Sequence, residues 1–156
     1  MHVKRVESGG PVLDPPQMTH QTADPVHPRF RRVNVWDAHM LWVWANDPLT
    51  MEMSHREFIP FDKHLEWFRD HAISNTFWIA VDSDDVPVGY LRLEKGWLSY
   101  GVSPPERGRG IGTAIVSSAV PGVRAKAYPE NKASLAIFRK LEWHEIKHDK
   151  YVEFRR

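Results

Sequence analysis

The hydrophobic pattern predicts a strand and then a helix at the start of the patterned part of the chain. Residues 30–35 alternate between apolar and polar side chains, which is typical of a strand. Apolar side chains then recur at Trp36, Met40, Val43 and Trp44. This i, i+4, i+7, i+8 spacing places them on one face of a helix, which we expect to lie toward the core.

A second helix is predicted to begin at Pro60. The segment 46–48 ends the first helix, because the residue before a proline leaves the helical region of backbone conformation. In the second helix Leu65, Phe68 and Ala72 share one stripe. Two helices therefore precede most of the predicted sheet.

The rest of the chain is predicted to alternate between strands and helices. The expected elements are strands at 76–82, 88–94 and 97–102, a helix at 110–119, a strand at 123–128, a helix at 131–141, and one or two strands within 143–154. The dipeptide 95–96 forms a two-residue hairpin turn. The order predicts a mixed α/β fold, with a mostly antiparallel sheet of about six to seven strands and helices on both faces.

Residues 1–28 differ from the remainder because they contain many prolines and no strand or helix period. Such a segment buries too little apolar surface to offset the entropy of ordering it. We therefore predict a flexible N-terminal tail at 1–28 and a single domain at 29–156, which suits a chain of 156 residues.

Charge and composition narrow the function classes. The formal net charge is +1, which gives no electrostatic reason to expect nucleic acid or an anionic membrane as a partner. The chain has no cysteine, so disulfides, thiolate metal sites and cysteine nucleophiles are excluded. His144 and His148 would stand ~13 Å apart on a strand, so no metal site is predicted. With no apolar run of ~18 residues, we expect a cytoplasmic protein.

A glycine-rich loop connects the strand predicted at 97–102 to the following helix. It reads Arg107-Gly108-Arg109-Gly110-Ile111-Gly112-Thr113. Three glycines allow the backbone to turn tightly and to aim consecutive N–H groups at one point. The helix N-terminus adds about half a positive charge, and the two arginines add full charges. The loop therefore predicts a diphosphate-binding site.

Two other nucleotide-binding loops do not fit this segment. A Walker loop requires Lys-Ser or Lys-Thr after its last glycine, whereas Gly112 is followed by Thr113 and Ala114. A Rossmann fingerprint belongs to the first strand and helix of a parallel unit. This loop comes late in the chain and follows a predicted antiparallel hairpin, so it belongs to a different class.

Two motifs resemble the GNAT acetyltransferase superfamily. The first is a strand ending in V-x-P, followed by Q/R-x-x-G-x-G/A at a helix start, and it matches Val102, Pro104, Arg107, Gly110 and Gly112. The second resembles N-x-x-[SA]-x-x-x-[YF]-x-x-x-G-F, and it matches Asn131, Ser134, Ile137, Phe138 and Leu141. The resemblance spans roughly residues 30–154. It implies the GNAT fold and N-acetyl transfer from acetyl-CoA to an amine.

The resemblance also implies roles for residues at the coenzyme. Val102 is expected to offer its backbone to the acetyl and pantetheine amides in a gap beside the next strand. Residues 107–113 are expected to hold the pyrophosphate through N–H groups. Asn131 is expected to reach the pantetheine arm, and Phe138 to lie near the thioester.

The usual proton-transfer positions of the family are occupied by residues that cannot transfer protons. Trp97 stands five residues before Val102, where many members have a carboxylate, and Glu94 is the nearest alternative base. Phe138 stands where many members have a tyrosine that protonates the leaving sulfur. A thiolate leaves without an acid, or Ser134 or water substitutes.

The acceptor is predicted from a narrower resemblance. The segments 42–48 and 64–68 resemble the amino-sugar-nucleotide N-acetyltransferases of the pseudaminic acid pathway. His64 matches a sugar-nucleotide contact and is a candidate base, and Asn46 matches the asparagine of W-R-N, whose arginine is replaced by Ala45. Trp97 is a candidate for stacking on a sugar or base.

We therefore predict an N-acetyltransferase for a small-molecule amine, most simply an amino sugar, either free or nucleotide-linked. Two alternatives stay open: a protein N-terminal acetyltransferase, and a catalytically inactive module that binds acetyl-CoA. GNAT proteins often dimerise, so a homodimer is a possible assembly.

Overall fold

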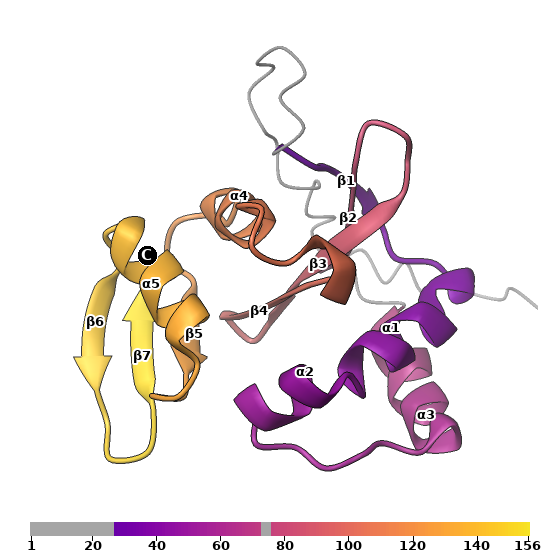
Figure 1. The fold of residues 1–156 in the computed structure, drawn as a ribbon, viewed down its shortest axis with the longest axis horizontal. Coiled ribbons are helices and arrows are strands. Elements are labelled where there is room, and N and C mark those ends of the chain that lie inside the picture. Colours follow the sequence, from indigo (N-terminus) through magenta and orange to yellow (C-terminus); the bar gives the residue numbers. More distant parts are fainter. Residues whose placement is uncertain (1–26, 73–75) are drawn as a thin grey trace, which may run out of the picture.

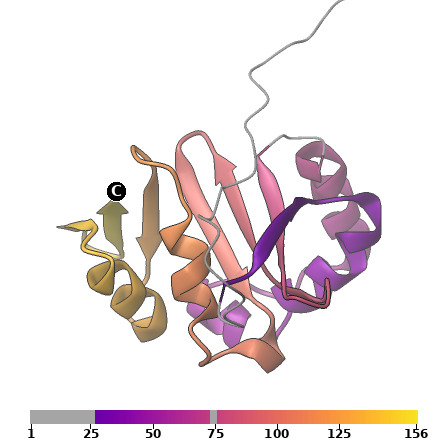
Figure 2. The same ribbon diagram turned by 90° about the horizontal axis from the view of Figure 1, so that it is seen from above.

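The computed structural model describes residues 27–72 and 76–156. The predicted tail at 1–28 lies outside the described residues except for its last two positions. In the described part, the chain forms a seven-stranded sheet with helices on both faces (Figures 1 and 2).

The sheet is antiparallel except at one junction, which confirms the predicted mixed fold. Its strands are β1 (Arg29–Arg32), β2 (Phe77–Val81), β3 (Pro87–Glu94), β4 (Trp97–Val102), β5 (Arg124–Ala127), β6 (His144–Lys147) and β7 (Val152–Arg155). Their order across the sheet is β1-β2-β3-β4-β5-β7-β6, and β4 and β5 are the parallel neighbours. The segment predicted as one or two strands forms both β6 and β7.

The parallel junction between β4 and β5 is paired at one position only, Trp97 with Arg124. Beyond that pair β4 continues to Val102, where it remains paired with β3 on its other side. The junction therefore opens a gap in the sheet at the end of β4, as the resemblance implied.

Helices cover the two faces of the sheet separately. They are α1 (Ala38–Ala45), α2 (Pro48–Met53), α3 (Phe61–Ala72), α4 (Ile111–Ser117) and α5 (Lys132–Lys140). One core joins α1 and α3 to the side chains of β2 that include Phe77 and Ile79. The other core lies under α4 and α5 and contains Trp78 and Ala80 of the same strand. Strand alternation thus assigns each β2 side chain to one of two cores.

The first helix differs from the predicted one in register. Its buried residues are Ala38 and Leu41, whereas Trp36 is 87% exposed and Val43 is 47% exposed. Residues 35–37 form a 3-10 turn that Asn34 caps, so the helical period begins at Ala38. Of the predicted stripe, Met40 and Trp44 therefore pack against the core, whereas Trp36 and Val43 do not.

Helix α2 was not predicted. Asp47 accepts a hydrogen bond from the N–H of Thr50 at 3.1 Å, which caps the helix, and Pro48 occupies the first helical position. Proline is favoured there because its missing N–H would be unpaired in any case. The same Asp-Pro pair that ends α1 therefore begins α2.

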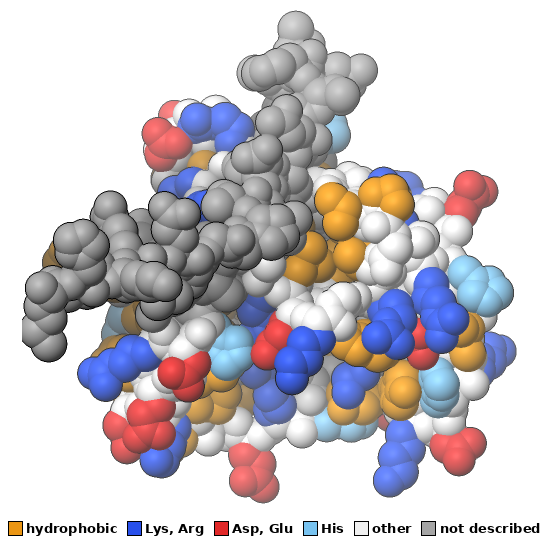
Figure 3. Space-filling model, turned by 180° about the vertical axis from the view of Figure 1, so that it is seen from behind, with side chains coloured by type: hydrophobic (Ala, Val, Ile, Leu, Met, Phe, Trp, Pro, Cys, Tyr) orange, Lys and Arg blue, Asp and Glu red, His pale blue; other side chains and the backbone are white. Residues whose placement is uncertain are grey.

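The described surface carries charges of both signs. Lys, Arg, Asp and Glu side chains are interspersed over the described residues visible in Figure 3, without a large area of one sign. Within residues 27–72 and 76–156, no helix is long and apolar enough to cross a membrane, and no His, Asp and Glu group is arranged to hold a metal ion.

Candidate functional site

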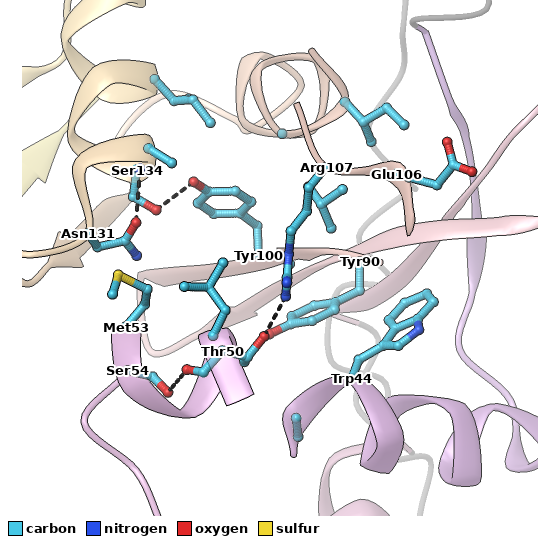
Figure 4. Close-up of a pocket in the computed structure, with 18 of the residues that line it drawn as sticks. Trp44, Thr50, Met53, Ser54, Tyr90, Tyr100, Glu106, Arg107, Asn131 and Ser134 are labelled. Atoms are coloured by element: carbon cyan, nitrogen blue, oxygen red, sulfur yellow. Dashed lines mark hydrogen bonds between the residues drawn. The ribbon is translucent and has the colours of Figure 1, made fainter. Parts of the chain in front are cut away.

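A cavity of about 990 Å³ lies between α1–α3 and the place where β4 and β5 separate (Figure 4). We call its two parts the loop half and the aromatic half. The loop half is lined by Tyr100, Val102, residues 106–108 and 110–113, residues 130–134, and Ile137. The aromatic half is lined by Leu41, Trp44, His64, Trp67, Phe77, Tyr90 and Arg92. Residues of α2 lie between them.

The glycine-rich loop reaches the cavity through its backbone. Gly108 and Gly110 have φ values of 74° and 81°, which favour glycine, and a Cβ at Gly108 would meet nothing within 4 Å. Gly110 caps α4, and its carbonyl accepts the N–H of Ala114 at 3.1 Å. The N–H groups before Ala114 have no partner within the helix, so they are available to an anion.

Gly112 is a glycine because α4 approaches its neighbours closely. A Cβ at this position would lie 3.0 Å from Cδ1 of Ile137, 3.4 Å from Cγ2 of Val102 and 3.5 Å from Cε2 of Tyr100. These neighbours come from α5 and β4. The glycine therefore allows three elements to meet at the floor of the loop half.

Arg107 crosses the cavity and joins the loop to α2. Its guanidinium donates to Oδ2 of Asp47 at 2.7 Å. It also donates to Oγ1 of Thr50 at 2.9 Å (Figure 4). Partial burial raises the pKa of Asp47, but the bonds from Arg107 and Thr50 outweigh it and hold that pKa below its ordinary value. The ion pair links the two sides of the cavity.

Tyr100 and Ser134 place two hydroxyls in the loop half. Their oxygens lie 2.7 Å apart, and burial raises the pKa of Tyr100 to about 12, with the Ser134 bond opposing the shift. The phenol therefore stays protonated at neutral pH. Asn131 caps α5 by accepting the N–H of Ser134 at 3.1 Å, which holds this pair at the cavity wall.

Phe138 lies behind Tyr100 and not in the cavity lining. It is 1% exposed, and its ring makes an edge contact with Tyr100 and stacks on Phe154. Arg109, also predicted at the coenzyme, forms an exposed ion pair with Glu106 and does not line the cavity. The remaining predicted coenzyme residues are brought together in the loop half.

The aromatic half is built on one face of β3. Tyr90 pairs with Gly101 of β4, where a Cβ would overlap the Tyr90 ring at 2.4 Å, so the ring lies across the strand. Arg92 is two residues further along the same face, and its guanidinium lies 5.1 Å from the Trp67 ring centroid. Side chains of α1 and α3 form the opposite wall.

His64 is buried in this wall as a neutral imidazole. Its Nε2 lies 2.8 Å from the carbonyl oxygen of Ala38, and since a carbonyl only accepts, Nε2 carries the proton. Burial lowers the pKa of His64, although the bond to Ala38 opposes the shift. The ring is only 3% exposed, and Nδ1 is its unprotonated nitrogen.

Three further predicted residues do not line the cavity. Glu94 lies at the end of β3, where it contacts His71 at 3.2 Å. Trp97 packs under the guanidinium of Arg124, 4.4 Å from its ring centroid. The side-chain amide of Asn46 accepts the N–H of Ile59 at 2.8 Å and donates to the carbonyl of Ile59 at 3.1 Å, which fixes the segment between α2 and α3.

Other lining residues were missed by sequence reasoning. They are Trp44, Trp67, Tyr90 and Arg92. A signal for the last two was present, since strand alternation places residues 90 and 92 on one face of β3. The packing of α1 and α3 determines which face of β3 borders the cavity. That packing could not be predicted from the sequence pattern.

Comparisons with known proteins agree with this geometry. The Acetyltransferase (GNAT) family profile matches residues 36–143. An L-2,4-diaminobutyric acid acetyltransferase from Nocardia farcinica is 30% identical, over 85% of this chain and 72% of that protein. The chain belongs to the GNAT acetyltransferase family. It is therefore a GNAT N-acetyltransferase, and its co-substrate is acetyl-CoA.

Solved structures show the same GNAT fold. A Vibrio cholerae spermidine N-acetyltransferase in complex with CoA and spermine has a TM-score of 0.70 at 14% identity, covering 81% of this chain and 95% of that one. An acetyltransferase from Thermus thermophilus has a TM-score of 0.65 at 18% identity, covering 82% and 95%. At these identities the likeness concerns the fold.

The loop half of this GNAT chain fits the coenzyme. Unpaired backbone N–H groups at the start of α4 suit a pyrophosphate, and the open space at Gly108 allows an anion to approach the backbone. The gap beside β4 is where the family resemblance expects the pantetheine arm. The Nocardia farcinica relative is named for an amino acid acceptor, L-2,4-diaminobutyric acid. The family of this chain is therefore established, whereas the predicted amino-sugar acceptor is not.

Proposed function

We propose that this enzyme acetylates a small-molecule amine bound in the aromatic half, using acetyl-CoA bound in the loop half. The continuity of the cavity carries this proposal, because one space of about 990 Å³ joins both sets of residues. Acetyl-CoA supplies an acetyl group on sulfur: a C–N bond forms, the C–S bond breaks, and the sulfur leaves with its electron pair.

In this proposal the loop half holds the coenzyme. Backbone N–H groups of residues 107–113 bind the pyrophosphate, and the backbone of Val102 and the side chain of Asn131 contact the pantetheine arm. Tyr100 and Ser134 form a protonated hydroxyl pair on the same wall. Many family members have a tyrosine at the position of Phe138, and this hydroxyl pair performs its role here. It donates a hydrogen bond to the departing sulfur.

His64 is the proposed proton acceptor in the aromatic half. An amine must lose a proton as its C–N bond forms, and a base must be within hydrogen-bond reach or one water away. His64 is neutral because burial lowers its pKa, and its Nδ1 is unprotonated. Glu94, the other predicted base, does not line the cavity and is held beside His71.

Two acceptor classes are proposed for this site. A diamino acid is favoured by the diaminobutyric acid acetyltransferase relative. An amino sugar, free or linked to a nucleotide, is favoured by the resemblance at His64 and by the Trp44 and Tyr90 rings, on which a sugar can stack. The structure gives Asn46 no free group for contacting a sugar, because its side-chain amide is hydrogen-bonded to the backbone of Ile59.

An amine panel tests the proposal. Purified protein is incubated with acetyl-CoA and with L-2,4-diaminobutyrate, amino sugars, UDP-linked amino sugars, polyamines or N-terminal peptides, and amine-dependent release of CoA is followed. The proposal expects turnover of a small amine and none of the peptides. Turnover of peptides alone would favour a protein N-terminal acetyltransferase, and coenzyme binding without turnover would favour an inactive binding module.

A further inference from the structure

We propose that Arg92 binds an anionic group of the acceptor, so that the substrate class is an amine that also carries a carboxylate or a phosphate. Because this role presupposes the acetyl transfer proposed above, it is tested by binding as well as by turnover. The two family motifs in this sequence do not include this position on β3.

The strand register directs Arg92 into the aromatic half. Arg92 pairs with Phe77 of β2 and with Ser99 of β4, and Phe77 belongs to the core under α1 and α3. Tyr90, two residues earlier, lies on the same face. Both side chains line the cavity opposite α1 and α3. Arg92 therefore lies on the acceptor side of the sheet.

The half-buried guanidinium of Arg92 forms a loose ion pair with Glu94 but no hydrogen bond to it. Its Nε is buried and has no hydrogen-bond partner among the described residues. Oε2 of Glu94 is 3.8 Å from Nη2, beyond hydrogen-bond distance, and that side chain is 47% exposed and also contacts His71. A guanidinium is always charged, and removing a charge from water without close hydrogen bonds is costly. A carboxylate or phosphate bound at the exposed part of the guanidinium would supply the charge-assisted hydrogen bonds that Glu94 does not make.

The charges around the cavity point to the same class of acceptor. Among the described residues, the carboxylates in the cavity lining belong to Glu106 and Glu130, both in the loop half. The aromatic half contains Arg92, the neutral His64, and otherwise apolar or aromatic side chains. The other cationic lining residues are Arg56, Arg107 and Lys132. A polyamine would bring several positive charges to this half and find no acidic partner, whereas an anionic group would find Arg92.

The position also suits the reaction. A positive charge beside the acceptor lowers the pKa of the amine and so raises the fraction of neutral amine that can attack. The indole of Trp67 under the guanidinium holds the arginine in place by a cation–π contact. Arg92 would thus both select the acceptor and favour its reactive form.

Two matched pairs of amines test the role of Arg92. L-2,4-diaminobutyrate is compared with 1,3-diaminopropane, which lacks only the carboxylate, and glucosamine 6-phosphate is compared with glucosamine. For wild type and Arg92→Gln, kcat/KM is measured by CoA release, and acceptor binding to the CoA-loaded protein is measured by calorimetry. We expect the wild type to prefer the anionic member of one pair by about 10- to 100-fold, the range of a charge-assisted hydrogen bond.

In Arg92→Gln this preference should fall to within about threefold, while Arg92→Lys should retain part of it. Arg124→Gln is the matched control, because Arg124 also lies over an indole, that of Trp97, but does not line the cavity. It should keep the wild-type preference. The pair that shows the effect identifies carboxylate or phosphate as the anion.

Two results would overturn the role of Arg92: an unchanged preference in Arg92→Gln, or no preference for the anionic member of either pair in the wild type. Failure of the acetyltransferase function is distinguishable from both. In that case no amine would be acetylated, while calorimetry would still report whether anionic acceptors bind through Arg92.

Discussion

The two halves of the cavity recognise their ligands by different means. The loop half presents backbone, with glycines at positive φ and a helix start whose first residues line the cavity. The aromatic half presents side chains from α1, α3 and β3, which are far apart in the sequence. A coenzyme shared by a whole family suits the first arrangement, because backbone groups persist through substitution. An acceptor that differs among members suits the second.

The halves also differ in charge. The loop half contains the carboxylates of Glu106 and Glu130 together with the cations of Arg107 and Lys132, and the Arg107–Asp47 ion pair connects it to the start of α2. The aromatic half combines a neutral His64 with the unpaired Nε of Arg92. Substitutions in the aromatic half should therefore change acceptor use alone, whereas those in the loop half should change coenzyme affinity for every acceptor alike.

The largest expected effect is at His64. His64→Gln keeps a donor for the Ala38 carbonyl but removes the base, so kcat should fall about 100-fold or more while the acetyl-CoA Kd stays unchanged. In the wild type, burial lowers the pKa of His64 below its ordinary 6.5, so the acid limb of kcat should lie below pH 6.5. His71→Gln, on the same helix but outside the cavity lining, is the control. An equal loss of kcat in both variants would contradict the proposed role of His64 as the base.

Gly112→Val should cause the next largest effect, and in the loop half. The added side chain would press on Ile137, Val102 and Tyr100, all within 3.5 Å of the Cβ position. Overpacking of this kind costs about 1–3 kcal/mol, which corresponds to roughly 5- to 160-fold in acetyl-CoA Kd measured by calorimetry. An unchanged Kd in a protein with unchanged thermal unfolding would contradict this description of the loop half.

Gly108→Ala should weaken coenzyme binding up to about tenfold. Forcing a Cβ into the left-handed region costs about 1–2 kcal/mol, and the loop would relax away from its present shape. Gly122→Ala is closely matched, since Gly122 has φ 88° and open space around its Cβ but lies outside the cavity lining. The two variants should lose similar stability, and only Gly108→Ala should raise the Kd. The same Kd in both would contradict backbone recognition at Gly108.

Asp47→Asn should have the smallest effect, at the boundary between the halves. Asparagine still caps α2, but the ion pair with Arg107 is lost, which should lower the free energy of unfolding by about 1 kcal/mol. Because the fold lowers the pKa of Asp47, this stabilisation is present above its ordinary value of 3.8 and is lost as pH falls through the lowered pKa. Thermal unfolding of the two proteins should therefore differ at pH 7 and converge in acid. If the thermal unfolding of the two proteins still differed in acid, the loss of stability would not come from the Arg107–Asp47 ion pair.

The contrast between the halves also explains what the sequence could predict. The strand at 97–102 has the predicted bounds, and the residues of the glycine-rich loop lie together except for Arg109, because local backbone conformation and residue spacing determine both. Helix α2 was missed because Asp47 and Pro48 both end one helix and begin another. The register of α1 was missed because a 3-10 turn precedes it.

Side-chain roles that depend on tertiary packing were harder to predict. Counting five residues back from Val102 leads to Trp97, but that residue sits at the point where β4 and β5 still pair, away from the cavity. Phe138 has the expected position on α5, yet Tyr100 stands between it and the cavity. Arg92 belongs to no motif, and its importance arises only when α3 places Trp67 beside it.

The central claim is that one cavity brings acetyl-CoA and a small amine together. The most direct measurement is initial-rate kinetics with acetyl-CoA and L-2,4-diaminobutyrate varied together, with the acetylated product identified by mass spectrometry. The claim predicts CoA release that saturates in both substrates, with one acetyl group added to the amine. Tight acetyl-CoA binding by calorimetry, combined with no amine-dependent CoA release across the full acceptor panel, would contradict it.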